Sequence, residues 1–208
     1  MEIQTPSVAE VRAARERFRE VEPRGLFYRA ATELVDLALS HKTKLSVSEA
    51  IAVLLQTWNV TFYRFNKFDA GHFDKLDTLL KQHADVLNSL RKRQIETSSA
   101  DDEQKIARLF DDFEALLGPV GAAKCLHLMA PSLFPPWDNA IAAKLRCRLA
   151  RSGTNSSRYL RFFRCTKQQV LHLASEDKTL QDKLKAIDEY NYVTFTLPML
   201  LRKRPKYL

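Results

Sequence analysis

The chain has 208 residues, of which 45% are hydrophobic, and only five glycines. This composition excludes a disordered chain and is sufficient for a substantial core, in one domain or in two closely packed lobes. No apolar run is long enough to cross a bilayer, and the first residues lack the apolar core of a secretory signal. We therefore expect a monomer that is cytoplasmic (nucleoid-associated) or nuclear, and not secreted.

The net charge of +8 is distributed unevenly along the chain. Residues 1–138 carry 18 basic and 20 acidic side chains, whereas residues 139–208 carry 15 basic and 5 acidic ones. No acidic residue occurs between Asn139 and Ser175, a segment that contains Lys144, Arg146, Arg148, Arg151, Arg158, Arg161, Arg164 and Lys167. A solvated face normally mixes both signs, so this segment predicts contact with the phosphates of DNA. An anionic membrane surface and an acidic protein partner are the alternatives.

The first half of the chain predicts helices, because strand-like alternation is nearly absent. Capping boxes at Ser7 and Ser46 each predict the start of a helix. The residues after Ser46 are apolar on nearly every side, which is typical of a central helix. The expected elements are a helix from Ser7 that ends before Pro23, a helix over 26–41, the helix after Ser46, two or three short helices over 60–93, and a loop over 96–102.

The clearest helical periodicity lies between Ile106 and Leu117, and it ends at Gly118-Pro119. A helix over 122–130 follows, and the prolines after it predict an extended connection. Asp138 then opens a helix that we expect to reach about Leu149, followed by a loop over 152–157 and two or three helices up to Tyr190. The chain is therefore predicted to be all-α.

The three cysteines, Cys125, Cys147 and Cys165, are too few for a four-cysteine site and lack a CxxC spacing. They cannot form a four-cysteine zinc site or hold an iron–sulfur cluster. We expect unpaired thiols, no metal and no cofactor.

The Gly118-Pro-Val-Gly121 turn lies between two predicted helices. Glycine permits unusual φ values and the close approach of another backbone at both ends of this turn. The amides of such a turn and of the next helix N-terminus can bind a phosphate oxygen, which fixes a protein on a duplex without reading its sequence.

This stretch resembles the helix-hairpin-helix superfamily of DNA glycosylases, which includes the endonuclease III and 8-oxoguanine glycosylase types. Gly118, Val120 and Gly121 match the family hairpin, Asp138 matches the catalytic aspartate, and Arg148-Leu149 match the end of the helix that this aspartate opens. Upstream, the segment Leu54-Leu55-Gln56-Thr57 is similar to the family segment whose glutamine wedges into the duplex. The resemblance covers roughly residues 46–150.

The resemblance implies that Asp138 stabilises the oxocarbenium ion formed when an N-glycosidic bond breaks. Gln56 would fill the gap left by an extruded base, and Trp58 and Trp137 would form the walls of the base pocket. The family's Schiff-base lysine falls on Ala123, which implies a monofunctional enzyme. Lys124, one residue further on, is the second candidate catalytic residue, as a nucleophile. A two-lobed fold is implied, with residues 46–138 as the hairpin-bearing lobe, residues 1–45 and 139–208 as the other, and DNA in the cleft between them.

Each of these residues also has a structural interpretation. Asp138 is a suitable N-cap for its own helix. Both tryptophans are more typical of a core than of a pocket, Gln56 could satisfy a buried carbonyl, and Lys124 could contact phosphate or solvent. Three other functions remain open: a non-catalytic DNA-binding protein of the same fold, an N-glycosidase acting on a nucleoside or RNA base, and a helical protein whose basic segment binds an acidic partner.

Overall fold

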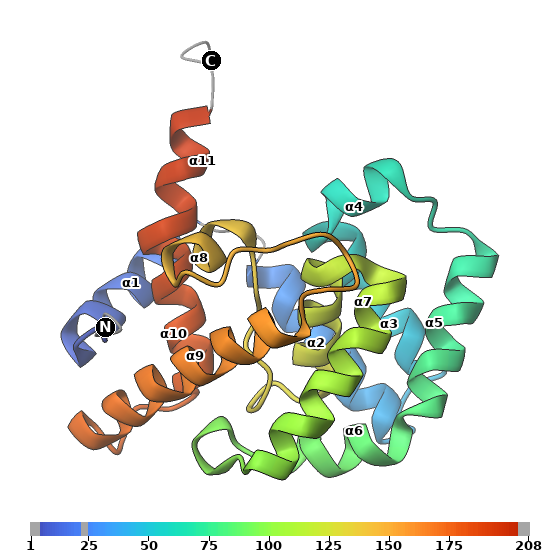
Figure 1. Cartoon of the computed structure of the whole chain (residues 1–208), viewed down its shortest axis with the longest axis horizontal. Coiled ribbons are helices and arrows are strands. Elements are labelled where there is room, and N and C mark those ends of the chain that lie inside the picture. The colour runs from blue at the N-terminus through green and yellow to red at the C-terminus, as the bar shows by residue number, and fades with distance from the viewer. Residues whose placement is uncertain (1–4, 22–24, 204–208) are drawn as a thin grey trace.

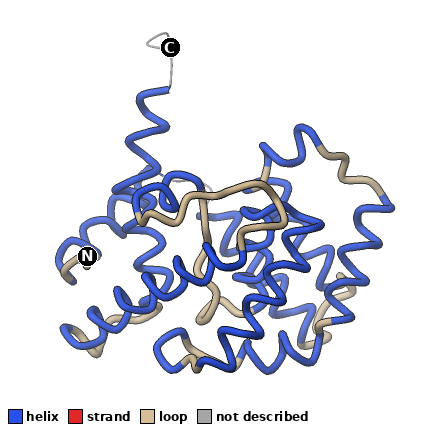
Figure 2. The backbone as a smooth tube through the Cα atoms, viewed as in Figure 1, coloured by secondary structure: helices blue, strands red, loops and turns tan. Residues whose placement is uncertain are grey.

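The structure is a computed structural model that describes residues 5–21 and 25–203. These residues form helices and loops and contain no strand, which confirms the all-α prediction (Figures 1 and 2). None of the described helices is both long enough and apolar enough to span a membrane.

The first six helices include both predicted capping boxes. At Ser7, the hydroxyl accepts a hydrogen bond from the Glu10 amide, and the Glu10 carboxylate accepts one from the Ser7 amide. Ser46 and Glu49 form the same reciprocal pair. The helices are α1 (Val8–Val21), α2 (Gly25–Leu39), α3 (Val47–Trp58), α4 (Val60–Phe65), α5 (Ala70–Gln82) and α6 (Ala84–Arg91).

The polar stretch predicted as a loop over 96–102 is instead the start of the longest helix. A short 3₁₀ turn, η1 (Ile95–Thr97), is followed by α7 (Ala100–Met129). Ser99 caps α7 and forms a capping box with Asp102. The acidic residues here belong to the first helical turn, where they stabilise the positive end of the helix dipole. Inside α7, Gly118 has non-helical angles (φ 67°, ψ 169°), so the helix is broken where the sequence predicted a turn.

The helix after Asp138 is shorter than expected. It is α8 (Asn139–Lys144), and Arg146 after it has a left-handed φ of 55°. The Cys147 amide donates to the Ala142 carbonyl, and the Arg146 amide donates to that of Ala143. This is the Schellman arrangement that ends a helix. Arg148 and Leu149 therefore lie in the loop after α8, and not at a helix end.

The remaining elements are α9 (Ser156–Glu176), α10 (Lys183–Asn191), the π-helical turn η2 (Tyr192–Thr196) and α11 (Leu197–Lys203). Figure 1 shows α2 to α7 gathered on one side of the molecule and α1, α8, α10 and α11 on the other, with α9 crossing toward α7. The two N-terminal helices are separated, because α1 packs on α10 whereas α2 packs along α3. Rings of Phe110, Trp137, Tyr159 and Phe162 pack together in the core between α7 and α9.

Candidate functional site

The glycine break in α7 is seated tightly against the junction of α3 and α4. A Cβ at Gly121 would lie 2.6 Å from Nδ2 of Asn59, and one at Gly118 would lie 3.2 Å from the Phe62 ring. Nδ2 of Asn59 donates a hydrogen bond to the Leu117 carbonyl at 3.3 Å, just before the break. Glycine is thus required at Gly118 by its φ and at Gly121 by the close approach of Asn59.

The break opens onto a groove of about 490 Å³, called here the outer groove. It is bordered by the break, by α4 and its two caps, by the start of α8, by the loop after α8, and by the η2 turn with α11. Its lining residues are Asn59, Phe62, Phe65, Asn66, Leu117, Gly118, Pro119, Val120, Asp138, Asn139, Ala140, Leu149, Thr196 and Met199. The fold therefore brings the predicted turn residues Gly118 and Val120 to the same groove as Asp138.

Asp138 caps α8, as its structural interpretation predicted. Oδ1 of Asp138 accepts a hydrogen bond from the Ile141 amide at 2.8 Å, and Oδ2 accepts one from the Thr196 hydroxyl at 2.9 Å. The residue is nevertheless only half-buried, and it borders a second cavity as well as the outer groove. An ionised carboxylate has lone pairs for more than two hydrogen bonds, so both contacts leave it able to interact with a ligand.

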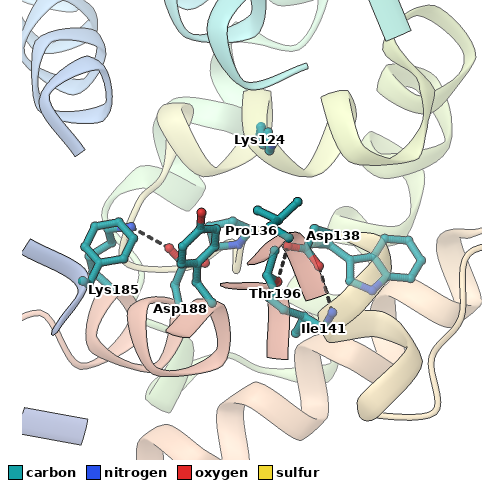
Figure 3. A pocket seen from close by; sticks show the side chains of 11 residues that line it. Lys124, Pro136, Asp138, Ile141, Lys185, Asp188 and Thr196 are labelled. Carbon is teal, nitrogen blue, oxygen red and sulfur yellow. Dashed lines mark hydrogen bonds and ion pairs between the residues drawn. The ribbon is translucent and has the colours of Figure 1, made fainter. Parts of the chain in front are cut away.

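The second cavity, called here the inner cavity, has a volume of about 200 Å³. Helices α1, α7, α8, α10 and α11 and the η2 turn all contribute to it. Figure 3 shows Asp138, Thr196 and Ile141 on one side of it and the Lys185–Asp188 pair on the other. The lining residues are Phe18, Lys124, Pro136, Trp137, Asp138, Ile141, Lys185, Asp188, Tyr192, Thr196 and Leu200.

One wall of the inner cavity carries charge and aromatic rings together. Nζ of Lys185 lies 2.5 Å from Oδ2 of Asp188 and 5.2 Å from the centroid of the Phe18 ring. The rings of Phe18 and Tyr192 meet edge to face with centroids 5.5 Å apart. Sequence reasoning missed Phe18, because α1 reaches the site only through its packing on α10 and η2.

Of the two tryptophans predicted to form the base pocket, Trp137 borders the inner cavity but has no exposed surface. Its ring stacks on the Phe162 ring with centroids 6.0 Å apart, and its centroid lies 5.9 Å from that of the Phe110 ring. The ring thus belongs to the core, as its structural interpretation predicted, while the residue also borders the cavity. The side chain of Trp58 lies outside the described residues.

Lys124 and Gln56 have different relations to the site. Lys124 is half-buried and lines the inner cavity together with Asp138, whereas the preceding Ala123 is fully buried in the core. Gln56 is exposed on α3, so it does not satisfy a buried carbonyl, and it lines neither the outer groove nor the inner cavity. Phe65, which the sequence did not single out, lines the outer groove with 79% of its surface exposed.

The basic segment reaches the outer groove through Leu149, while none of its arginines lines the groove. Arg146, Arg148 and Arg151 are exposed on the loop after α8, and Arg158 and Arg161 are exposed on α9. The Arg158 side chain donates to the Arg148 carbonyl at 2.9 Å.

Two other cations of the basic segment are held by the protein itself. Nε and Nη2 of Arg164 lie 2.9 and 2.7 Å from the Glu103 carboxylate. Lys167 donates to the Ser98 carbonyl at 2.7 Å. Arg164 and Lys167 thus contact residues before and at the start of α7, whereas the hydrogen bond from Arg158 to Arg148 lies within the basic segment itself.

Among the described residues, no cluster of three or more histidine, cysteine or acidic side chains could hold a metal ion. Comparisons of the chain with protein-family models, with curated proteins and with solved structures found no match.

Proposed function

We propose that the protein is a monofunctional DNA glycosylase that hydrolyses the N-glycosidic bond of a modified or damaged base. The observation that carries the proposal is the position of Asp138, which borders both the outer groove and the inner cavity. A nucleotide flipped from a duplex at the groove would place its base in the cavity and its sugar beside this carboxylate. The cavity of about 200 Å³ is smaller than the pockets of about 300–1,000 Å³ that hold drug-sized ligands, which suits a single base.

In the proposed reaction the bond between C1′ and the base nitrogen breaks, and its electron pair leaves with the base. Positive charge develops on the sugar, and the ionised Asp138 stabilises it at close range. Water then adds its hydroxyl to C1′, and its remaining proton balances the proton taken up by the departing base. The products are the free base and an abasic site.

DNA would bind across the outer groove. The exposed arginines of the loop after α8 flank Leu149 in the sequence, and Leu149 lines the groove, so they would contact the phosphates on that side. On the other side, backbone amides of the glycine break would donate to a phosphate oxygen. These contacts are independent of base sequence, so they would hold the duplex while the inner cavity selects the base.

A panel of duplexes carrying oxidised, alkylated, deaminated or hypermodified bases, scored for abasic sites, tests the proposal. Wild type should release at least one base, and Asp138→Asn should abolish release while duplex affinity is kept. Asparagine is as good an N-cap as aspartate, so this variant is expected to fold. Equal release by Asp138→Asn and wild type would refute the role of the carboxylate.

The same panel separates the alternatives. A non-catalytic DNA-binding protein would bind every duplex and release no base, whereas a nucleoside N-glycosidase would turn over a small substrate with little dependence on salt. Borohydride trapping tests the monofunctional mechanism, because only an enzyme that forms a Schiff base gives a covalent adduct with DNA. We expect no adduct. An adduct that Lys124→Gln removes would instead assign Lys124 as a nucleophile.

A further inference from the structure

The C-terminal helical run contains a turn of unusual geometry beside Asp138. Between α10 and α11, residues Tyr192–Thr196 form a π-helical turn, and the Leu197 amide donates to the carbonyl of Tyr192, five residues back. Such a turn amounts to one residue inserted into an α-helix and is frequently found at functional sites. Since each residue of an α-helix adds about 100° of rotation, the insertion changes which downstream side chains face α8.

Thr196 ends this turn and faces the candidate site. Its side chain is largely buried, with 8% of the residue exposed, and it borders both the inner cavity and the outer groove. Its hydroxyl donates to Oδ2 of Asp138, 58 positions earlier in the sequence (Figure 3). The η2 turn packs against α8 and α1, which fixes the position of the hydroxyl relative to the carboxylate.

The two hydrogen bonds to Asp138 have different origins. The bond from Ile141 is local and would form in any helix capped by aspartate. The bond from Thr196 depends on the tertiary fold and on the extra residue in the π turn. Each bond holds one oxygen of the carboxylate, so the two bonds together fix the side chain in a single orientation between groove and cavity.

We infer that Thr196 is a positioning residue, which the π turn places so that the Asp138 carboxylate is held toward the reacting sugar. This inference rests on the proposed function, because orientation of the carboxylate matters for rate only if Asp138 acts in bond cleavage. Misplacement of a catalytic group by about 1 Å can cost on the order of 100-fold in rate.

Thr196→Val removes the hydroxyl and keeps the shape of the side chain, and Thr196→Ser restores the donor. Single-turnover base release at saturating duplex should fall roughly 10- to 100-fold in Thr196→Val, with unchanged duplex affinity. Thr196→Ser should return the rate to near the wild-type value. The matched control is Thr78→Val on α5, a threonine whose hydroxyl bonds only to the Asp74 carbonyl of its own helix.

Amide hydrogen exchange at Ile141 provides a second readout that does not need activity. The Ile141 amide lies in the first turn of α8 and donates to Asp138, so its protection depends on the orientation of the carboxylate. Thr196→Val should speed this exchange about 5-fold, the factor that corresponds to a hydrogen bond of about 1 kcal/mol, and Thr196→Ser should restore protection.

The outcomes separate the two proposals. If wild type releases no base from any duplex, the proposed function fails, and Ile141 exchange still decides whether Thr196 orients Asp138. If Thr196→Val keeps both the wild-type rate and the wild-type exchange, the positioning role is overturned. Equal slowing by the valine and serine variants would also overturn it, because that pattern indicates a packing role.

Discussion

Glu114 and Asn155 hold the arginine-bearing loop after α8 against the core. Glu114 is fully buried on α7, and its Oε1 accepts a hydrogen bond from the Asn155 side-chain amide at 2.5 Å. Asn155 is also fully buried, and its side chain bonds to the amide and carbonyl of Ala150 and to the carbonyl of Arg151. One asparagine thus links a buried carboxylate to the backbone that carries Arg151.

Asn155→Ala should destabilise the protein by about 3 kcal/mol. It leaves the Glu114 carboxylate buried without its side-chain donor, and an unsatisfied buried group costs about 1–3 kcal/mol, or more when it is charged. Urea unfolding of wild type and variant measures the difference. Asn66→Ala is the control, because its side chain also donates one hydrogen bond, to the Phe62 carbonyl, but is exposed. Similar losses in both variants would contradict the structural role of the buried pair.

Local sequence signals predicted the features of this fold that depend on neighbouring residues. The capping boxes at Ser7 and Ser46, the break at Gly118 and the N-cap at Asp138 each depend on residues within one or two helical turns. The early end of α8 was missed, because a Schellman turn usually carries glycine at the left-handed position and here Arg146 occupies it.

The part of the site that sequence reasoning missed is tertiary. Thr196 reaches the inner cavity from the η2 turn, and Phe18 reaches it from α1. No spacing in the sequence relates either residue to Asp138. Tyr192, from the same η2 turn as Thr196, also lines the cavity. Trp137 belongs to the core and also borders the inner cavity, and its position beside an aspartate in the sequence does not separate these two placements.

Gly121→Ala should destabilise the protein by about 1–3 kcal/mol, the usual cost of overpacking. Its Cβ would lie 2.6 Å from Nδ2 of Asn59, so the junction of α3 and α4 must move away from α7. Urea unfolding measures the cost. Gly71→Ala on α5 is the matched control, because its Cβ would meet only Oδ1 of Asp69, at 3.7 Å. That variant should be neutral or more stable, since alanine favours a helix by up to about 1 kcal/mol over glycine. If Gly71→Ala lost stability and Gly121→Ala did not, the conclusion that the close approach of Asn59 requires glycine at Gly121 would be wrong.

His127 should make the protein less stable in mild acid. Burial lowers the pKa of His127 from 6.5 to about 4. The neutral ring has room for one proton, so Nδ1 donates to the Phe134 carbonyl at 2.6 Å and Nε2 accepts from the Tyr28 hydroxyl at 2.8 Å. Between these two pKa values the unfolded chain binds a proton that the folded protein does not. Stability is therefore fully present above about pH 6.5 and is lost as the pH falls toward 4, by about 3 kcal/mol in all.

Urea unfolding of wild type and His127→Gln at several pH values between 7 and 4.5 measures this contribution. The difference in unfolding free energy between the two proteins should shrink as the pH falls, because glutamine does not titrate. A difference that stays constant over this range would show that His127 is not buried as a neutral ring.

Exposed arginines on the loop after α8 should account for part of the salt dependence of DNA binding. Each phosphate contact contributes a slope of about −0.9 to log K against log salt concentration on duplex DNA. If Arg148 and Arg151 contact phosphates, the double variant Arg148→Gln, Arg151→Gln should make the slope shallower by about 2, equally for specific and unrelated duplexes. Fluorescence anisotropy over a range of salt concentrations measures it.

Arg164→Gln is the matched control, because this arginine belongs to the same acid-free segment but is paired with Glu103. A guanidinium that is paired with a carboxylate of the protein does not contact a DNA phosphate and therefore releases no counterion from the DNA. Its removal should leave the slope within error of wild type. If all three arginines were equivalent, each would change the slope by a similar amount, and the basic segment would act through its total charge. A change confined to Arg148 and Arg151 would instead place the phosphates beside Leu149, at the edge of the outer groove.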